Sequence, residues 1–173
     1  MLQIQLLGGF SVVVDGEAIP DERWRSRKAR SLVKLLALAA GQRLQRDQVI
    51  DLLWPDSELD AAANNLHQAL YAARRVLDGF GPGCLVLEEG KLSLSAGEGS
   101  ALMVDVVQFE AAAAQAKGSQ EPGVLQAALA IYTGELLPDD LYEEWAVQRR
   151  DSLRQVYLNL LLDLARLQET GED

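Results

Sequence analysis

The sequence predicts an α+β domain followed by an all-α domain, on the basis of three observations. Short apolar segments separated by glycine-containing turns come first and are typical of a small antiparallel sheet. Helical periodicity begins near residue 26. The last part of the chain is rich in alanine and leucine, with helical spacing. We therefore expect one domain over residues 1–96 and a second over residues 102–173.

The N-terminal segment predicts a small sheet. Leu2 to Leu7 and Phe10 to Val14 alternate or run apolar, with β-branched residues, on either side of a Gly-Gly pair. An Asp-Gly pair at residue 15 supplies a hairpin turn, and Glu17 to Ile19 can return as a short third strand. Pro20 ends that strand because proline has no N–H group to donate to the ladder.

Two helices follow the sheet. Ser26 is a suitable N-cap for the first, and Gly41 is a suitable stop. Its buried stripe is expected to be Ala29, Leu32, Val33, Leu35, Leu36 and Ala39. The second helix spans Arg46 to Trp54 and ends before Pro55, with Val49, Ile50, Leu53 and Trp54 facing inward.

A third helix is predicted from Asp60 to Asp78, and its two faces differ in chemistry. Its apolar stripe is expected to be Leu59, Ala63, Leu66, Leu70, Ala73 and Leu77. The opposite face carries Asn64, Gln68, Tyr71 and Arg75, flanked by His67 and Arg74. Amide, phenol and guanidinium groups can bind base edges and phosphates in a major groove. The same residue types also occur on ordinary solvated helices, so that alternative stays open.

The order of these segments predicts a helix-turn-helix unit, in which the last helix enters the groove and the preceding helix supports it. After the loop at residues 79–83, Cys84 to Leu87 and Leu92 to Ser95 flank a turn at Glu88 to Lys91. These segments predict a β-hairpin directly after the polar-faced helix. A hairpin in this position is a wing.

The charge of the chain is unevenly distributed. The net charge is −10, but residues 1–95 hold 11 Lys and Arg against 12 Asp and Glu, whereas residues 96–173 hold 5 against 14. Arg23 to Lys34 contains six basic residues and no acid. Arg25, Arg27, Lys28 and Arg30 could therefore bind phosphate together with the start of the first helix. A solvated basic face is the alternative reading.

Several classes of function are disfavoured. One cysteine and one histidine exclude a disulfide within the chain and a thiolate or multi-histidine metal site, and Cys84 lies in an apolar run typical of a buried strand. The loop at residues 79–83 lacks the GK[ST] of a phosphate-binding loop, and no histidine accompanies Asp139-Asp140 and Glu143-Glu144. We expect neither catalysis nor a cofactor. No long apolar run or leader is evident, so a cytoplasmic location without a membrane partner is expected.

The C-terminal part predicts three helices. Val104 to Lys117 has Asp105 as an N-cap, Val124 to Tyr132 follows a proline, and Leu141 to Gln168 is long and amphipathic. Small residues at contact positions favour close pairing, as in tetratricopeptide-like arrays that bind partners: Ala112, Ala113, Ala116, Ala127 and Ala130. An acidic cluster is either a partner surface or solvated loop charge: Glu135, Asp139, Asp140, Glu143 and Glu144.

Long phrases of the chain resemble a known family. LLGGFSVVVDG, SRKARSLVKLLALAAGQRLQRDQVIDLLWPD and AAANNLHQALYAARRVL resemble the OmpR-type winged-helix domain of the Streptomyces antibiotic regulatory protein family. VDVVQFEAAAAQA and ALAIYTGELLPDDLYEEWAVQRRDSLRQVYLNLLLDLA are similar to its bacterial transcriptional activation domain. The wing turn EEGK is more acidic than is usual in that family. The resemblance implies that the chain is the N-terminal part of a longer protein.

The resemblance also implies a function. Members of the family bind direct repeats near promoters, where two copies could lie head to tail, and they contact RNA polymerase to activate transcription. The third helix reads the major groove, which corresponds here to Asn64, Gln68, Tyr71 and Arg75. DNA-backbone contacts would fall to Arg25, Arg27, Lys28, Arg30, His67, Arg74 and Lys91. The alternative function is a helical-repeat adaptor for protein partners whose winged helix does not read DNA.

Overall fold

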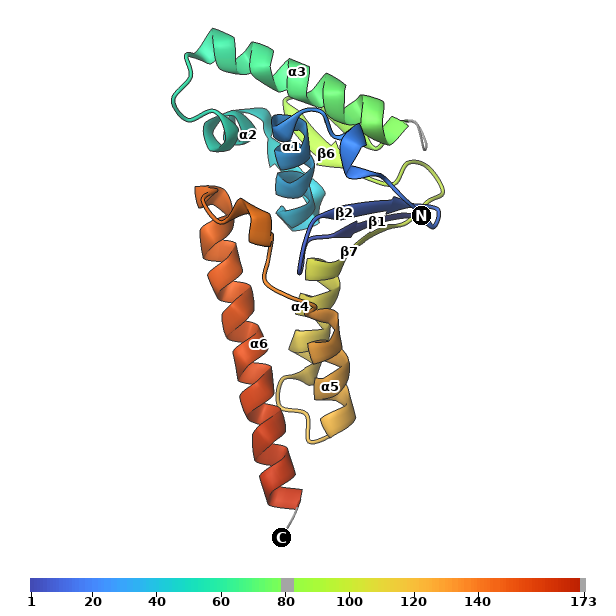
Figure 1. Ribbon diagram of the computed structural model, residues 1–173, viewed down its shortest axis with the longest axis vertical. Helices are drawn as coiled ribbons and strands as arrows, with labels where there is room; N and C mark the ends of the chain where they lie inside the picture. The colour runs from blue at the N-terminus through green and yellow to red at the C-terminus, as the bar shows by residue number, and fades with distance from the viewer. Residues whose placement is uncertain (79–82, 172–173) are drawn as a thin grey trace. The chain divides into compact units, whose positions relative to one another are not determined.

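The computed structural model describes residues 1–78 and 83–171 (Figure 1). The chain divides into two compact units. The first contains Met1–Ile4 and Ser11–Leu102, and the second contains Gln5–Phe10 and Met103–Asp173. This division differs from the expected domains because a short N-terminal segment belongs with the C-terminal helices. The expected loop at residues 79–83 lies, except for Gly83, outside the described residues.

A four-stranded sheet contains the N-terminal strands in the order β3-β2-β1-β7. Its strands are β1 (Leu2–Gln5), β2 (Ser11–Val14), β3 (Glu17–Ala18) and β7 (Leu102–Val104). The hairpin of β2 and β3 was predicted, and Val13 pairs with Ala18 in it. The strand β7 was not predicted. The N–H of Leu2 donates to the carbonyl of Ala101 at 2.9 Å, just before that strand begins.

Three helices form the core of the first unit, and each packs against the other two (Figure 1). They are α1 (Arg27–Leu38), α2 (Arg46–Leu53) and α3 (Leu59–Leu77). The predicted N-cap of α1 is confirmed, because Ser26 Oγ accepts a hydrogen bond from the N–H of Ala29 at 3.1 Å. The helix ends at Leu38, and Gly41 turns the chain just beyond it with a φ of 62°.

The buried stripe of α3 is rotated relative to the expected one. Leu59 was expected in the core, but its side chain is 79% exposed, and Ala63 is only half-buried. The buried residues are Ala62, Leu66, Ala69, Leu70, Ala73, Val76 and Leu77. Ala62, Ala69 and Val76 recur every seven residues, the spacing at which one helix meets another. Leu59, the first residue of α3, therefore faces away from the core, whereas Ala62 in the same turn is buried.

A second sheet has the strand order β4-β6-β5. The hairpin of β5 (Leu85–Glu88) and β6 (Lys91–Leu94) was predicted, and Glu89 and Gly90 turn it with φ values of 49° and 75°. The short strand β4 (Arg43–Gln45) was not predicted. It pairs with β6 through Leu44 opposite Leu92, which joins the hairpin to the segment between α1 and α2. The hairpin is therefore part of a three-stranded sheet.

The second unit contains α4 (Asp105–Ala116), α5 (Pro122–Ile131) and α6 (Glu144–Gly171). The helix α5 packs against both α4 and α6, and α4 also contacts α6 (Figure 1). Asp105 is the first residue of α4, and Val104 occupies the N-cap position, so the predicted cap is wrong in detail. The Asp105 carboxylate accepts hydrogen bonds from the N–H groups of Leu6, Leu7 and Val106 at 2.8–3.0 Å.

The segment Gln5–Phe10 is held by residues that follow α5 as well as by Asp105. Leu6 and Leu7 have no exposed surface. Leu7 forms a β-bridge with Leu136, and its carbonyl accepts a hydrogen bond from Thr133 Oγ1 at 2.8 Å. The second unit therefore includes a short segment from the start of the chain. None of the described helices is long and apolar enough to cross a bilayer.

Candidate nucleic-acid interface

The polar face of α3 is exposed along its length, as predicted. Asn64, Gln68, Tyr71 and Arg75 all lie on the surface, and Tyr71 is 64% exposed. His67 is also exposed. The guanidinium carbon of Arg75 lies 5.9 Å from the centre of the Tyr71 ring, within the range of a cation–π contact. One face of a 19-residue helix thus offers amide, phenol and guanidinium groups to a ligand.

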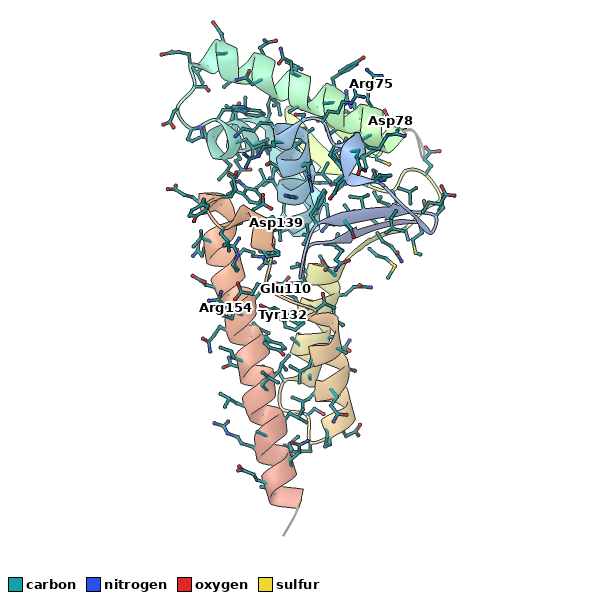
Figure 2. All side chains as sticks on the ribbon, viewed as in Figure 1. Arg75, Asp78, Glu110, Tyr132, Asp139 and Arg154 are labelled. Carbon is teal, nitrogen blue, oxygen red and sulfur yellow. The ribbon has the colours of Figure 1, made fainter. Side chains whose placement is uncertain are left out.

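The basic segment before α1 lies beside the C-terminal half of α3. A hollow of about 390 Å³ lies between them, and one side of it is formed by the short 3-10 helix Asp21–Arg23 and the residues that follow it. Its lining combines two parts of the chain that are about fifty residues apart: Glu22, Arg23, Trp24, Arg25, Ser26 and Ala29 with Tyr71, Ala72, Arg75 and Val76. Figure 2 shows Arg75 near the C-terminal end of α3. The fold therefore gathers three arginines at one end of the polar face.

Trp24 positions this basic segment, although the sequence interpretation gave it no role. Its side chain is only 7% exposed, although its neighbours Arg23 and Arg25 are on the surface. A buried aromatic between two exposed arginines fixes the segment against the core, because an indole excludes a large apolar area from water. The signal for this role in the sequence was an aromatic residue within a run of basic residues.

The residues predicted to contact the DNA backbone do not behave alike. Arg25 and Arg27 are exposed. Arg30 is half-buried, and its guanidinium donates to the Asp21 carboxylate at 3.3 Å. Lys28 Nζ donates to the carbonyl of Leu53 at 2.5 Å and lies 5.6 Å from the centre of the Trp54 ring. Lys28 thus binds the C-terminal end of α2, where a cation is favoured.

Arg74 also has a structural contact. Its Nε donates to the carbonyl of Leu85 at 3.0 Å, which links α3 to the first strand of the hairpin. At the other end of the hairpin, Lys91 lies opposite Glu88 in the strand register. Arg43, Glu89 and Ser93 surround this pair in a shallow hollow. The hairpin tip therefore has mixed charge.

The ends of α3 differ in charge. Exposed acidic residues precede or begin the helix at Asp56, Glu58 and Asp60. Arg74 and Arg75 lie in its last turn. Acids near a helix N-terminus and cations near its C-terminus both stabilise the helix through its dipole. Because of the charges on these side chains, a polyanion would be attracted to the C-terminal end of α3 and not to its N-terminal end.

The described residues offer little to a metal or a nucleophilic reaction. Within residues 1–78 and 83–171, no cluster of three or more His, Cys, Asp or Glu could hold a metal ion. Cys84 is 6% exposed and lies directly before β5. Burial raises the pKa of its thiol, and the negative charge of Asp78 raises it further. Both effects disfavour the thiolate that a nucleophile would need.

Comparison with known proteins gives a likeness of fold. No family model matches the chain. No curated protein matches it either. A solved structure, Mycobacterium tuberculosis EmbR in complex with a low-affinity phosphopeptide, is similar with a TM-score of 0.62 and 21% sequence identity. The match covers 96% of this chain and 43% of the EmbR chain, so this chain spans less than half the length of that protein.

Proposed function

We propose that the first unit binds double-stranded DNA and that the protein regulates transcription. One observation is central: the polar face of α3 is exposed, and the fold brings Arg23 and Arg25 beside Tyr71 and Arg75 at one end of it. Amide groups can read base edges in the major groove, and guanidinium groups can bind phosphates or guanine. The exposed helix is about 28 Å long at 1.5 Å per residue, enough to lie across a groove.

The order of elements supports a winged-helix assignment for this unit. Three helices precede the hairpin of β5 and β6, as in a helix-turn-helix domain with a wing. In this proposal α3 enters the groove, α2 supports it, and the hairpin lies beside it as the wing. The likeness to EmbR covers 96% of this chain and supports the fold over both units.

The second unit has a different role in this proposal. Residues 103–173 hold 5 Lys and Arg against 13 Asp and Glu, a net of −8, which opposes contact with DNA. We propose that its helices contact RNA polymerase when the first unit is bound at a promoter. Binding to direct repeats would place two copies head to tail. The proposed protein is a non-catalytic regulator that acts in the cytoplasm.

A binding experiment with the whole chain tests the central proposal. DNA is selected from a random pool by the protein, and fluorescence anisotropy then measures affinity for the selected and a scrambled duplex at several salt concentrations. DNA binding predicts a linear fall of log K with log salt, and sequence reading predicts tighter binding to the selected duplex. Gln68→Ala should reduce the difference between the two duplexes. Equal, salt-independent affinities would refute the proposal.

A groove in the second unit supports the adaptor alternative. A hollow of about 530 Å³ lies between α4 and α6, and its lining includes Ala113, Ala114 and Leu162. Leu162, which lines the groove, is 55% exposed, and Leu158 and Leu161, which lie outside its lining, are 44% and 38% exposed on α6. An apolar groove of this kind can bind an amphipathic helix. An adaptor predicts that the chain captures a protein partner equally well in the presence and absence of DNA.

A further inference from the structure

The hollow between the basic segment and α3 is lined by arginine side chains and by apolar side chains. We infer that it binds one phosphodiester group of the DNA backbone, and that Arg75 contacts this phosphate and not a base. This inference rests on the proposed function. It changes the role that the sequence suggested for Arg75, and it divides the polar face of α3 into a base-reading part and a phosphate-binding part.

The lining of the hollow suits a phosphodiester. Arg23, Arg25 and Arg75 all border it, and a guanidinium group can donate two parallel hydrogen bonds to phosphate oxygens. Ser26, the N-cap of the 12-residue helix α1, also borders it. Glu22 is the acidic residue of the described lining, and the three arginines leave a net positive charge.

The apolar part of the lining fits the rest of a nucleotide unit. Trp24, Ala29, Tyr71, Ala72 and Val76 provide carbon surface beside the arginines. A backbone phosphate arrives with the sugar carbons on either side of it, which favours walls of this mixed character over a purely polar site. The hollow of about 390 Å³ is large enough for a phosphate with part of its sugars.

The length of α3 separates the two kinds of contact. Asn64 and Arg75 are eleven residues apart, which corresponds to about 16 Å along a helix axis. The major groove is about 12 Å wide, so a helix lying across it with Asn64 over the bases places Arg75 near the edge of the groove. In helix-turn-helix proteins the N-terminal part of the recognition helix contacts the bases. Asn64 and Gln68 then read bases, and Arg75 reaches the strand at the edge of the groove.

The contact between Arg75 and Tyr71 supports this assignment. The guanidinium carbon lies 5.9 Å from the ring centre, and both residues border the hollow. Stacking restricts the long arginine side chain before any ligand arrives, so less conformational entropy is lost on binding. Tyr71 acts here as a positioning residue for Arg75.

Variants of the whole chain test this inference, measured by anisotropy on the selected and the scrambled duplex. Arg75→Gln should weaken binding to both duplexes by the same factor, roughly 10-fold or more, because a charged hydrogen bond to phosphate is lost. The slope of log K against log salt should become less negative by about 1. Arg25→Gln should act in the same way, since Arg25 borders the same hollow.

Two controls separate this effect from others. Arg166→Gln makes the same change of charge on an exposed residue of the second unit, and it should leave both affinities unchanged. Gln68→Ala should change the ratio of the two affinities, which Arg75→Gln should not. Thermal unfolding by circular dichroism establishes that each variant is folded.

A neutral backbone linkage gives a direct test. Methylphosphonates are placed one at a time in the selected duplex. One position should cost clearly less in the Arg75→Gln variant than in the wild type, because both changes remove the contact between Arg75 and that phosphate. If the wild type binds the selected duplex but Arg75→Gln alters preference at one base pair, or has no effect, the inference is wrong and the proposed function stands. If the wild type binds no DNA, both fail.

Discussion

The backbone of Gly134 lies against that of Gly8, so closely that a Cβ atom on Gly134 would be 2.8 Å from the Cα of Gly8. The two glycines belong to segments that hydrogen bonds join on either side, from the N–H of Gly8 to the carbonyl of Glu135 and from Thr133 Oγ1 to the carbonyl of Leu7. Because residue 134 has no side chain, the segment Gln5–Phe10 can lie directly against the backbone there.

Gly134→Ala should destabilise the second unit by roughly 1–3 kcal/mol, because the added methyl group meets backbone atoms that cannot turn aside. Urea unfolding followed by circular dichroism measures the loss. Gly123→Ala is the matched control, since residue 123 lies in α5 with no atom within 4 Å of the added methyl group. That control should stabilise the helix by about 0.5–1 kcal/mol. Equal effects of the two substitutions would contradict the close approach.

Arg150 and Arg149 are neighbours whose substitution should destabilise the chain to different extents. Arg150 is 4% exposed, and its guanidinium donates to the carbonyls of Leu136, Leu137 and Asp140 at 2.8, 3.2 and 3.0 Å. Arg150→Met should cost roughly 3 kcal/mol of unfolding free energy, because three carbonyls lose a charged donor. Arg149→Met breaks only a half-exposed pair with Glu110 and should cost about 1 kcal/mol or less. Chemical denaturation distinguishes them, and a reversed order would contradict the geometry.

Asp105 predicts a pH dependence of stability. Burial raises the pKa of its carboxyl above the ordinary value of 3.8, although the N–H groups of Leu7, Leu6 and Val106 partly oppose this. The folded chain therefore holds a proton that the unfolded chain has released, in the window just above pH 3.8. Stability contributed by this group falls as the pH rises through that window.

Asp105→Asn should remove this contribution, so the difference in unfolding free energy between wild type and variant should change as the pH rises above 3.8, in the direction that favours the variant. Denaturation at a series of pH values measures it. Asp151→Asn removes an exposed carboxylate of α6 and serves as the comparison. A difference that does not vary with pH would refute the prediction.

Lys28 should affect stability more than DNA affinity. Lys28→Met keeps the aliphatic stem but removes the hydrogen bond to the carbonyl of Leu53, at a cost of roughly 1 kcal/mol. The sequence interpretation assigned Lys28 to the DNA backbone, a contact whose loss would weaken binding to all DNA sequences alike. With its ammonium group on the end of α2, it should change the salt slope less than Arg25→Gln does. Unfolding and anisotropy measurements on the same variants decide between the two roles. Equal changes of the salt slope in Lys28→Met and Arg25→Gln would support the DNA-backbone contact that the sequence suggested for Lys28.

The helices of the first unit could be predicted because local pattern determines them. Ser26 caps α1 through its own side chain, and Leu66, Leu70, Ala73 and Leu77 were placed correctly in the core. Leu59 was placed wrongly in the core, because helical periodicity indicates which face of a helix is apolar but not how far the neighbouring elements extend along that face. Alanine also occurs on both buried and exposed faces, so Ala62 and Ala69 gave no signal.

The contacts that depend on distant pairing could not be predicted. Residues 43–45 and 102–104 are too short to be recognised as strands, and they exist because β6 and β1 lie beside them. Asp105 had the residue type of an N-cap, but its partners Leu6 and Leu7 are about a hundred residues away. The polar face of α3 was visible in the sequence. Its association with Arg23 and Arg25 required the fold.

The segment Gln5–Phe10 constrains how this protein can be dissected. A fragment that stops near residue 102 would keep Leu6 and Leu7, which are fully buried in the intact chain, without the residues that bind them. A fragment that starts near residue 103 would lack the segment Gln5–Phe10, whose Leu7 pairs with Leu136. The first fragment would expose Leu6 and Leu7, and the second would lack the segment that pairs with Leu136. Insolubility of an isolated fragment would therefore indicate the loss of these contacts and not a failure of that fragment to bind its ligand.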